Sequence, residues 1–177
     1  MKTNANGNAF VRDSIFQALL TLMDEKTFEE ISISDITRRA NVSRMAYYRN
    51  YSSKEDILIS HLKEEVRQYV QFAQPNDSGE LRITQKNIAR LFEHCKEERR
   101  FILACDNAGL GYYFMDAFTA YLLRYFKREG EGKRREYILN AYASALYSTM
   151  VKWLRNGAAE TPEQMAEMLY EIYSPHV

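Results

Sequence analysis

The amino-acid sequence predicts an all-α fold of about nine helices, and three observations support this prediction. The 177 residues contain only seven glycines and three prolines, so few positions interrupt a helix. Apolar residues recur at three- and four-residue spacing along most of the chain, which is the period of an amphipathic helix. Serine or threonine stands ahead of several of these runs, where its oxygen can cap a helix. No segment predicts a strand convincingly, and no internal repeat is present.

The N-terminal third of the chain predicts a long helix followed by a short one. Residues 1–8 are polar and are expected to form a flexible arm. A first amphipathic helix is expected over about residues 9–24. Ser32 and Asp35 then form a capping box, in which each side chain accepts a backbone N–H of the other residue, and this box opens a short helix to about Arg39.

A turn and two further helices are expected next. Asn41 lies where the chain must reverse, and asparagine tolerates a left-handed backbone better than most residues. Ser43 is expected to cap a second short helix, from Arg44 to about Asn50. Ser52 and Glu55 are read as another capping box, which starts the long helix that follows.

The rest of the chain predicts five more helices after a loop at residues 74–79, QPNDSG. They are expected at about residues 84–97, 99–106, 109–128, 133–155 and 161–173. Gly130 and Gly132 separate the third of these from the fourth, and Thr161 caps the last.

Composition excludes several classes of protein. The N-terminus lacks the apolar stretch of a signal peptide, and no apolar run is long enough to span a bilayer, so a cytoplasmic protein without membrane contact is expected. The sequence contains no glycine-rich phosphate loop, catalytic triad or metal-ligand cluster, so we expect no enzyme activity, cofactor or metal. His94 and Cys95 are adjacent and would diverge on a helix. The two cysteines are expected to be buried thiols, and His61 is expected to be exposed.

Charge is segregated in the short-helix region, although the formal net charge of the chain is zero. The stretch from Ile36 to Lys54 contains no acidic residue but holds five cations: Arg38, Arg39, Arg44, Arg49 and Lys54. Burial of Ile36, Ala40, Val42 and Tyr47 would lock the two short helices together. The pattern predicts a helix–turn–helix at about residues 31–50, whose second helix enters the major groove of DNA. The alternative is a solvated basic face on a helical bundle.

The expected DNA contacts divide by chemistry. Arg44 would read base edges or phosphate, while Met45 and Ala46 would touch thymine methyl groups. Phosphate or backbone contacts are expected from the other polar residues of this region. These are Ser32, Ser34, Thr37, Tyr48, Arg49 and Lys54, while Ser43 is also expected to contact DNA and Asn50 is expected to contribute to sequence preference.

The segment ISISDITRRANVSRMAYYRNYSSKEDIL, residues 31–58, resembles the DNA-binding module of the TetR family of bacterial transcriptional regulators. The shared positions are Ile36, Ala40, Val42, Ser43, Tyr48, Tyr51, Ser53, Lys54 and Glu55. The resemblance implies a three-helix DNA-binding domain, residues 8–68, and a larger domain for dimerisation and effector binding, residues 69–177. It also implies that Tyr48 and Lys54 contact phosphate. Asn41, Ala46 and Asn50 depart from residues common in the family, so base preference does not carry over.

The last two expected helices carry the pattern of a dimer interface. Small residues line one face of the 133–155 helix, and an apolar stripe follows the last helix, which suits close helix packing. The pair resembles the four-helix dimer interface of the family. The expected interface residues are Ala141, Ala145, Thr149, Met165, Met168, Leu169 and Ile172. The alternative is a core within one chain.

An excess of aromatic residues suggests an effector pocket. Thirteen tyrosines occur, several of them in the 109–128 helix, where their hydroxyl groups could orient a small apolar or aromatic ligand. The expected lining residues are Phe92, Tyr112, Tyr113, Phe118, Tyr121 and Tyr147. Ordinary core packing is the alternative. The sequence thus predicts a dimeric repressor of a pseudo-palindromic operator, released by a small molecule; a regulator switched by a partner protein is the alternative.

Overall fold

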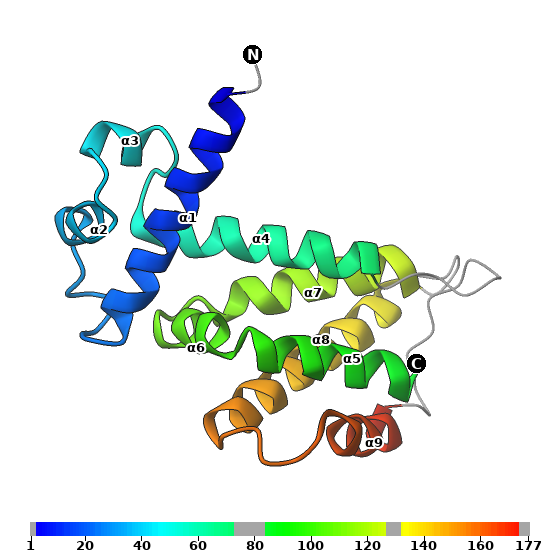
Figure 1. Cartoon of the computed structure of the whole chain (residues 1–177). Coiled ribbons are helices and arrows are strands. Elements are labelled where there is room, and N and C mark those ends of the chain that lie inside the picture. Colours follow the sequence, from blue (N-terminus) through cyan, green and yellow to red (C-terminus); the bar gives the residue numbers. More distant parts are fainter. Residues whose placement is uncertain (1–2, 73–83, 127–131, 174–177) are drawn as a thin grey trace. The chain divides into compact units, whose positions relative to one another are not determined.

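The computed structural model describes residues 3–72, 84–126 and 132–173, and within these ranges the secondary structure is entirely helical (Figure 1). The all-α prediction is therefore confirmed. The helices of the described ranges are α1 (Thr3–Met23), α2 (Ile33–Arg39), α3 (Arg44–Tyr48), α4 (Lys54–Phe72), α5 (Gln85–Glu97), α6 (Arg99–Asn107), α7 (Gly111–Phe126), α8 (Gly132–Arg155) and α9 (Pro162–Tyr173).

The chain forms two compact units. The first contains the chain up to Leu62 together with Ala104–Leu110, and the second contains Lys63–Leu103 and the chain from Gly111 onward. In the first unit α2 packs against α1, and α3 packs against α2. Its fully buried side chains come from α1, α2, α3, α4 and α6, and they are Ile15, Leu19, Ile36, Tyr47, Ile57, Leu58 and Cys105.

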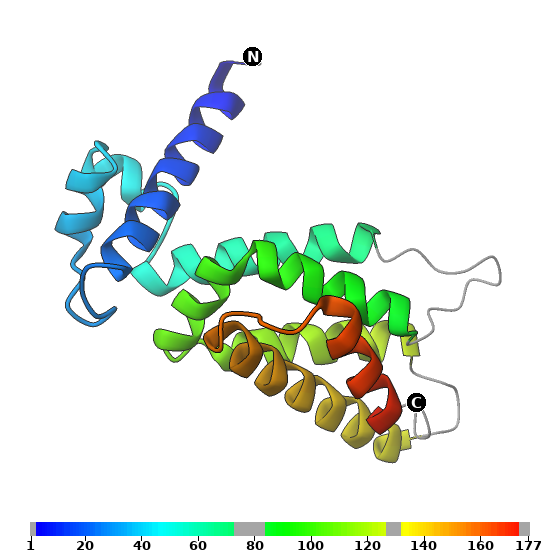
Figure 2. The same ribbon diagram turned by 60° about the horizontal axis from the view of Figure 1, so that its bottom comes forward.

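The second unit is a helical bundle in which α8 lies along α7 and α9 lies along α5 (Figure 2). Its core includes Phe92 of α5 and Leu154 of α8, both fully buried. Two hydrogen bonds hold the end of α8 in place. The indole N–H of Trp153 donates to the carbonyl of Glu160 (3.1 Å), and Nε of Arg99 donates to the carbonyl of Leu154 (3.0 Å).

Most helix boundaries agree with the sequence prediction to within two residues, but the N-terminal arm does not. Residues 3–8 are helical and extend α1, whereas a flexible arm was expected. Helix propagation explains the difference, since adding an asparagine or glycine to an existing helix costs at most about 1 kcal/mol per residue. The expected loop at residues 74–79 and the expected break at Gly130 lie outside the described residues.

Two local predictions are wrong. The cap of α4 is Ser53 instead of Ser52: the N–H of Asp56 donates to Ser53 Oγ (3.2 Å), and the Asp56 carboxylate accepts the N–H of Ser52 (2.9 Å). The N-cap therefore lies one residue later than expected, and the acidic residue three positions after it is Asp56 instead of Glu55. His61 is also only partly exposed, because its ring stacks on Phe16 at 3.7 Å between centroids.

Candidate nucleic-acid interface

The turn between α2 and α3 has the geometry of a helix–turn–helix. The capping box of α2 is complete, since the N–H of Asp35 donates to Ser32 Oγ (3.2 Å) and the N–H of Ser32 donates to the Asp35 carboxylate (3.1 Å). Asn41 has a φ of 53°, the left-handed conformation that reverses the chain. Ser43 then caps α3 by accepting the N–H of Ala46 (3.1 Å). These three local predictions are confirmed.

Buried side chains fix the angle between the two short helices. Ile36 and Tyr47 are fully buried, and Ala40 and Val42 are partly buried beside them. The ring of Tyr47 meets Tyr48 edge-on at 5.3 Å and lies 6.2 Å from the ring of Tyr51. Burial raises the pKa of the Tyr47 phenol well above its ordinary value. The five-residue α3 is thus held by packing rather than by its own length.

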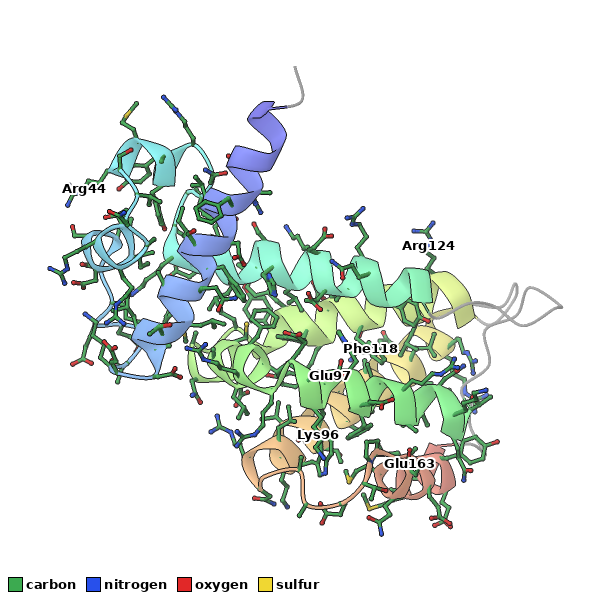
Figure 3. All side chains as sticks on the ribbon, viewed as in Figure 1. Arg44, Lys96, Glu97, Phe118, Arg124 and Glu163 are labelled. Carbon is green, nitrogen blue, oxygen red and sulfur yellow. The ribbon has the colours of Figure 1, made fainter. Side chains whose placement is uncertain are left out.

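The outer face of α3 projects large side chains into solvent. Met45 is 67% exposed and Tyr48 is 58% exposed, an unusual position for two large side chains with apolar surface. Arg44 and Arg49 are also exposed, and Figure 3 shows Arg44 at the outer edge of its unit. The guanidinium of Arg49 has no hydrogen bond or ion pair with any described residue. The face therefore offers two cations and apolar surface together.

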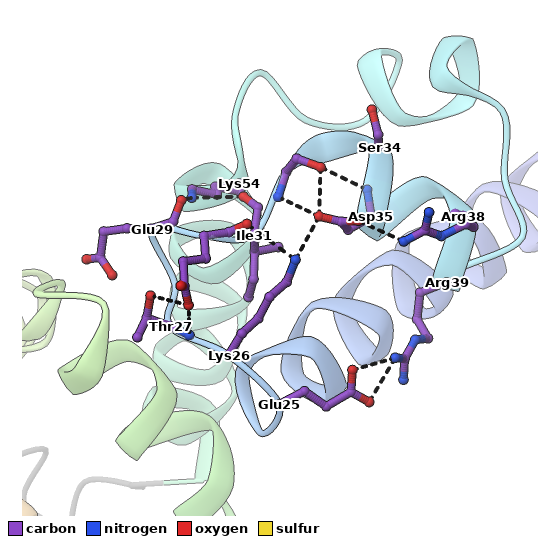
Figure 4. A network of polar contacts seen from close by, with 12 residues as sticks. Glu25, Lys26, Thr27, Glu29, Ile31, Ser34, Asp35, Arg38, Arg39 and Lys54 are labelled. Carbon is purple, nitrogen blue, oxygen red and sulfur yellow. Dashed lines mark hydrogen bonds and ion pairs between the residues drawn. The ribbon is translucent and has the colours of Figure 1, made fainter.

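Four of the five cations in the acid-free run have polar partners within the protein: Arg44 donates to the Ser34 hydroxyl, and Figure 4 shows the contacts of the other three. Arg38 pairs with Asp35 at 2.8 Å. Arg39 reaches back 14 residues and holds both carboxylate oxygens of Glu25, at 2.8 and 2.6 Å. Lys54 donates to backbone carbonyls. The basic character seen in the sequence is therefore partly neutralised by acidic residues that lie outside the run.

Lys54 joins the start of α4 to the segment between α1 and α2. Its ammonium group donates to the carbonyls of Phe28 (2.5 Å), Glu29 (3.2 Å) and Ile31 (3.0 Å). It also lies 4.5 Å from the centroid of the Phe28 ring. An ammonium group has three N–H donors, and each has an acceptor here. The phosphate contact expected of Lys54 stays a prediction, and it would require at least one of these bonds to break.

Asp35 is the centre of the polar network in the α1–α2 region. Its carboxylate accepts from Lys26 (2.8 Å), from the hydroxyl and N–H of Ser32, and from Arg38. The hydrogen bond from Lys26, followed by those from Ser32, holds the pKa of Asp35 well below its ordinary value. Sequence reasoning did not identify Lys26 or Glu25, because separations of 9 and 14 residues match no helical or capping spacing.

The remaining expected DNA contacts occupy different environments. Ser32, Ser34 and Ser43 are exposed, and Ala46 is partly exposed on α3. Thr37 is only 7% exposed, and its hydroxyl donates to the carbonyl of Ser34 (3.2 Å). Asn50 is partly buried, and its amide donates to the carbonyl of Ala46 (2.8 Å). Each of these DNA contacts stays a prediction.

The expected pocket residues take part in several aromatic pairs, and the pocket itself stays a prediction. Phe92 is fully buried against Trp153, edge-on at 5.1 Å, whereas Tyr112 is 52% exposed and lies beside Tyr113 at 4.0 Å. Phe118 lies near Tyr121 at 5.8 Å.

Tyr147 lies within 5.8 Å of the Phe114 ring, and its hydroxyl sits against Gly111. Aromatic pairs therefore line α7 and its junction with α8.

The expected interface residues divide between the core and the surface of the second unit. Met165 is 4% exposed and Leu169 is 2% exposed within a single chain. On the surface, Met168 is 45% exposed and Ile172 is 56% exposed. Ala141 is also exposed, and Ala145 and Thr149 are partly exposed. Tyr137 of α8, which was not predicted, is 68% exposed.

The described residues contain no group of three His, Cys, Asp or Glu side chains placed to hold a metal ion. His94 instead pairs with Glu65 at 3.2 Å. Burial, and then the nearby Glu98 carboxylate, raises the pKa of Glu65. Both cysteines are buried free thiols, and burial raises the pKa of Cys95 to about 12. No described helix combines the length and the apolar character that a membrane span requires.

Two family models match the chain. Residues 15–60 match the model described as bacterial regulatory proteins of the tetR family, and residues 84–174 match a transcriptional regulator C-terminal region. The chain is also similar to the HTH-type transcriptional regulator YxbF of Bacillus subtilis (strain 168). The two are 24% identical over 160 residues, which cover 88% of this chain and 42% of that protein.

Two solved structures share the fold across nearly the whole chain. The dihydroxyacetone kinase operon activator DhaS has a TM-score of 0.63 at 15% identity, with 92% of this chain and 93% of that one covered. NalD, the secondary repressor of the MexAB-OprM multidrug efflux pump in Pseudomonas aeruginosa, has a TM-score of 0.55 at 20% identity, with 91% and 93% covered. At these identities the likeness concerns the fold.

Proposed function

The chain belongs to the TetR family of bacterial regulatory proteins, whose members are DNA-binding transcriptional regulators and not enzymes, and we propose that it is a dimeric repressor released from its operator by an effector. The observation that carries the proposal is the outer face of α3, where Arg44, Met45, Tyr48 and Arg49 are exposed on a helix fixed by a buried lock. A short helix with exposed cations and apolar surface suits the major groove.

The roles of these residues follow from their chemistry. Arg44 is the first residue of α3, and the N-terminal end of a recognition helix is the part that reaches base edges. Met45 and Ala46 supply apolar contact to thymine methyl groups. Tyr48 and Arg49 lie at the other end of the helix and bind phosphate, which fixes register without reading sequence.

Dimerisation is proposed through the surface residues of α8 and α9. Met168 and Ile172 are exposed one turn apart on α9, and Ala141 offers a small exposed side chain on α8. Apolar side chains at this exposure favour burial against a second copy, which has the same patch in a two-fold dimer. A two-fold dimer reads two inverted half-sites, and their centres lie about 34–36 Å apart or at multiples of that distance.

Repression and effector release complete the proposal. A dimer on an operator can block transcription by occupancy alone, with no further contact to the transcription machinery. The aromatic pairs of α7 and α8 supply apolar surface and phenolic hydroxyls that suit a small aromatic effector. NalD is a repressor and DhaS an activator, so the direction of regulation needs its own measurement.

Selection of bound duplexes from a random pool tests the DNA-binding part. The expected result is an enriched inverted repeat whose half-sites are separated by about one helical turn, 10–10.5 base pairs, or a multiple of it. Enrichment of no sequence would contradict the proposal, and enrichment of a single half-site would contradict the dimer.

A reporter placed behind the selected sequence tests regulation. Expression should fall when the protein is present and return when an effector is added. Ligand screening by thermal shift should find compounds that stabilise the protein. A protein that represses the reporter, yet is stabilised by no compound in a broad panel, would favour the alternative of a partner-protein switch.

A further inference from the structure

Arg44 and Ser34 form a direct bond across the helix–turn–helix. The terminal Nη2 of Arg44, the first residue of α3, donates to Oγ of Ser34, the second residue of α2. We infer that Ser34 is a positioning residue, which holds the Arg44 guanidinium ready to read a base and does not itself need to contact DNA. This inference rests on the proposed function, because it assigns base reading to Arg44.

Both ends of this bond are fixed by their surroundings. Ser34 follows the cap residue Ser32 by two positions, so the capping box belongs to its neighbours and leaves the Ser34 hydroxyl available. Arg44 follows the cap of α3 directly. Between them, the N–H of Val42 donates to the carbonyl of Thr37 (3.0 Å), which closes the turn. Figure 4 shows the Ser34 side chain pointing away from the Asp35 network.

The bond orients Arg44 without cancelling its charge. Arg38 and Arg39 are held by carboxylates, which reduce their attraction for DNA. The partner of Arg44 is a neutral hydroxyl, so the full positive charge remains. Among the arginines of the run, Arg44 alone combines a fixed direction with an unneutralised charge within the described residues.

The geometry also leaves Arg44 able to read guanine. A guanidinium has five N–H donors, and the bond to Ser34 uses one of them. The others can still form the two parallel bonds to guanine O6 and N7 that specify this base in the major groove. A side chain ordered before binding loses less conformational freedom on binding, so the bond to Ser34 increases affinity for the specific sequence.

The test compares variants on the selected duplex and on a shuffled duplex of the same composition. Ser34→Ala should weaken binding to the selected duplex by about two- to tenfold, the contribution of one hydrogen bond, and leave binding to the shuffled duplex unchanged. Ser34→Thr keeps the hydroxyl and should retain wild-type binding. Ser34→Ala should cause no further loss in an Arg44→Ala background, because the positioned group is gone.

Two further variants control the experiment. Ser14→Ala removes a hydroxyl of α1 that bonds its own helix at the carbonyl of Phe10, and it should change neither affinity. Arg44→Lys keeps the charge but lacks the forked donors, so it should lose preference for guanine at one position of each half-site. If Ser34→Ala fails to fold, the inference is still tested by two measurements. Arg44→Lys should lose the preference for guanine, and Ser34→Thr should retain it.

Several results would overturn the inference. Equal weakening on both duplexes, additive with Arg44→Ala, would make Ser34 a phosphate ligand in its own right. An unchanged affinity of Ser34→Ala for the selected duplex would show that the bond has no effect on reading. A wild-type protein that binds no duplex selectively would overturn the proposed function as well, so the two failures are distinguishable.

Discussion

Asp35 accepts hydrogen bonds from Lys26, Ser32 and Arg38, and it therefore holds α2 to the end of α1. Its lowered pKa means that the ionised form is favoured by folding. Its contribution to stability is therefore present above the pKa of an unfolded aspartate, about 3.9, and is lost as the pH falls toward the lower value of the folded protein.

Asp35→Asn should lower the thermal midpoint near neutral pH and reduce its dependence on pH in the acid range. Thermal unfolding followed by circular dichroism from neutral to acid pH measures both effects. Glu29→Gln is the control, since it removes one exposed carboxylate from the segment just before α2. Equal pH profiles for wild type and Asp35→Asn would contradict the stabilising role of Asp35.

Lys54→Met should lower the free energy of unfolding by about 1–3 kcal/mol, because three backbone carbonyls lose a charged donor. Chemical denaturation measures this loss, and Lys63→Met, an exposed substitution on the same helix, is the control. If Lys54 acts only as a phosphate ligand, stability will be unchanged and DNA affinity alone will fall.

At the scale of single helices, substitution of two glycines by alanine should change the free energy of unfolding in opposite directions. A Cβ added at Gly7 of α1 would meet no atom within 4 Å, so Gly7→Ala should raise the free energy of unfolding by up to about 1 kcal/mol. A Cβ at Gly111, the first residue of α7, would meet the hydroxyl of Tyr147 and lie 2.8 Å from its Cζ.

Gly111→Ala should therefore lower the free energy of unfolding by about 1–3 kcal/mol, and it should cost less in a Tyr147→Leu background. Chemical denaturation of the single and double variants measures this coupling. An equal cost in both backgrounds would show that the Tyr147 ring moves aside freely.

Helix caps could be predicted from the sequence, whereas contacts between distant segments could not. The caps at Ser32, Ser43 and Thr161 were predictable, because each depends on residues within three positions. The contacts of Lys54 and Arg39 were not, since they join segments that only the folded chain brings together.

The apolar stripe of α9 could be predicted from the sequence, but which of its residues are buried could not. Helical spacing places Met165, Met168, Leu169 and Ile172 on one broad face, but spacing does not say which edge of that face packs on α5. The structure buries Met165 and Leu169 and exposes Met168 and Ile172.

For the whole molecule, the proposed dimer predicts that substitutions in its interface lower the molecular mass of the particle in solution. Met168→Glu combined with Ile172→Glu should shift the protein to monomer, because charges at the centre of an apolar interface are left unpaired. Analytical ultracentrifugation measures this shift. Lys96→Glu, an exposed substitution on α5, should leave the dimer intact. A monomeric wild type, or an unchanged dimer in the double variant, would contradict the proposed interface.

The ion pairs of Arg38 and Arg39 with carboxylates predict a weak dependence of DNA affinity on salt, because few cations remain to neutralise phosphates. If Arg49 is the only cation of each protomer that neutralises phosphate, a dimer neutralises two phosphates, and the slope of log affinity against log salt should be about −1.8. Titrations of the selected duplex at several salt concentrations measure it. A slope of about −3.6 or steeper would show that at least one further cation of each protomer, such as Arg38 or Arg39, neutralises phosphate on binding.

Trp153 is the one tryptophan in the sequence, and it lies in the second unit, 3% exposed and edge-on to Phe92. Its intrinsic fluorescence is consequently a natural optical label for that unit, while circular dichroism records the helices of both. Denaturation followed by the two signals in parallel would reveal whether the units melt together or in sequence, without any dye or engineered probe.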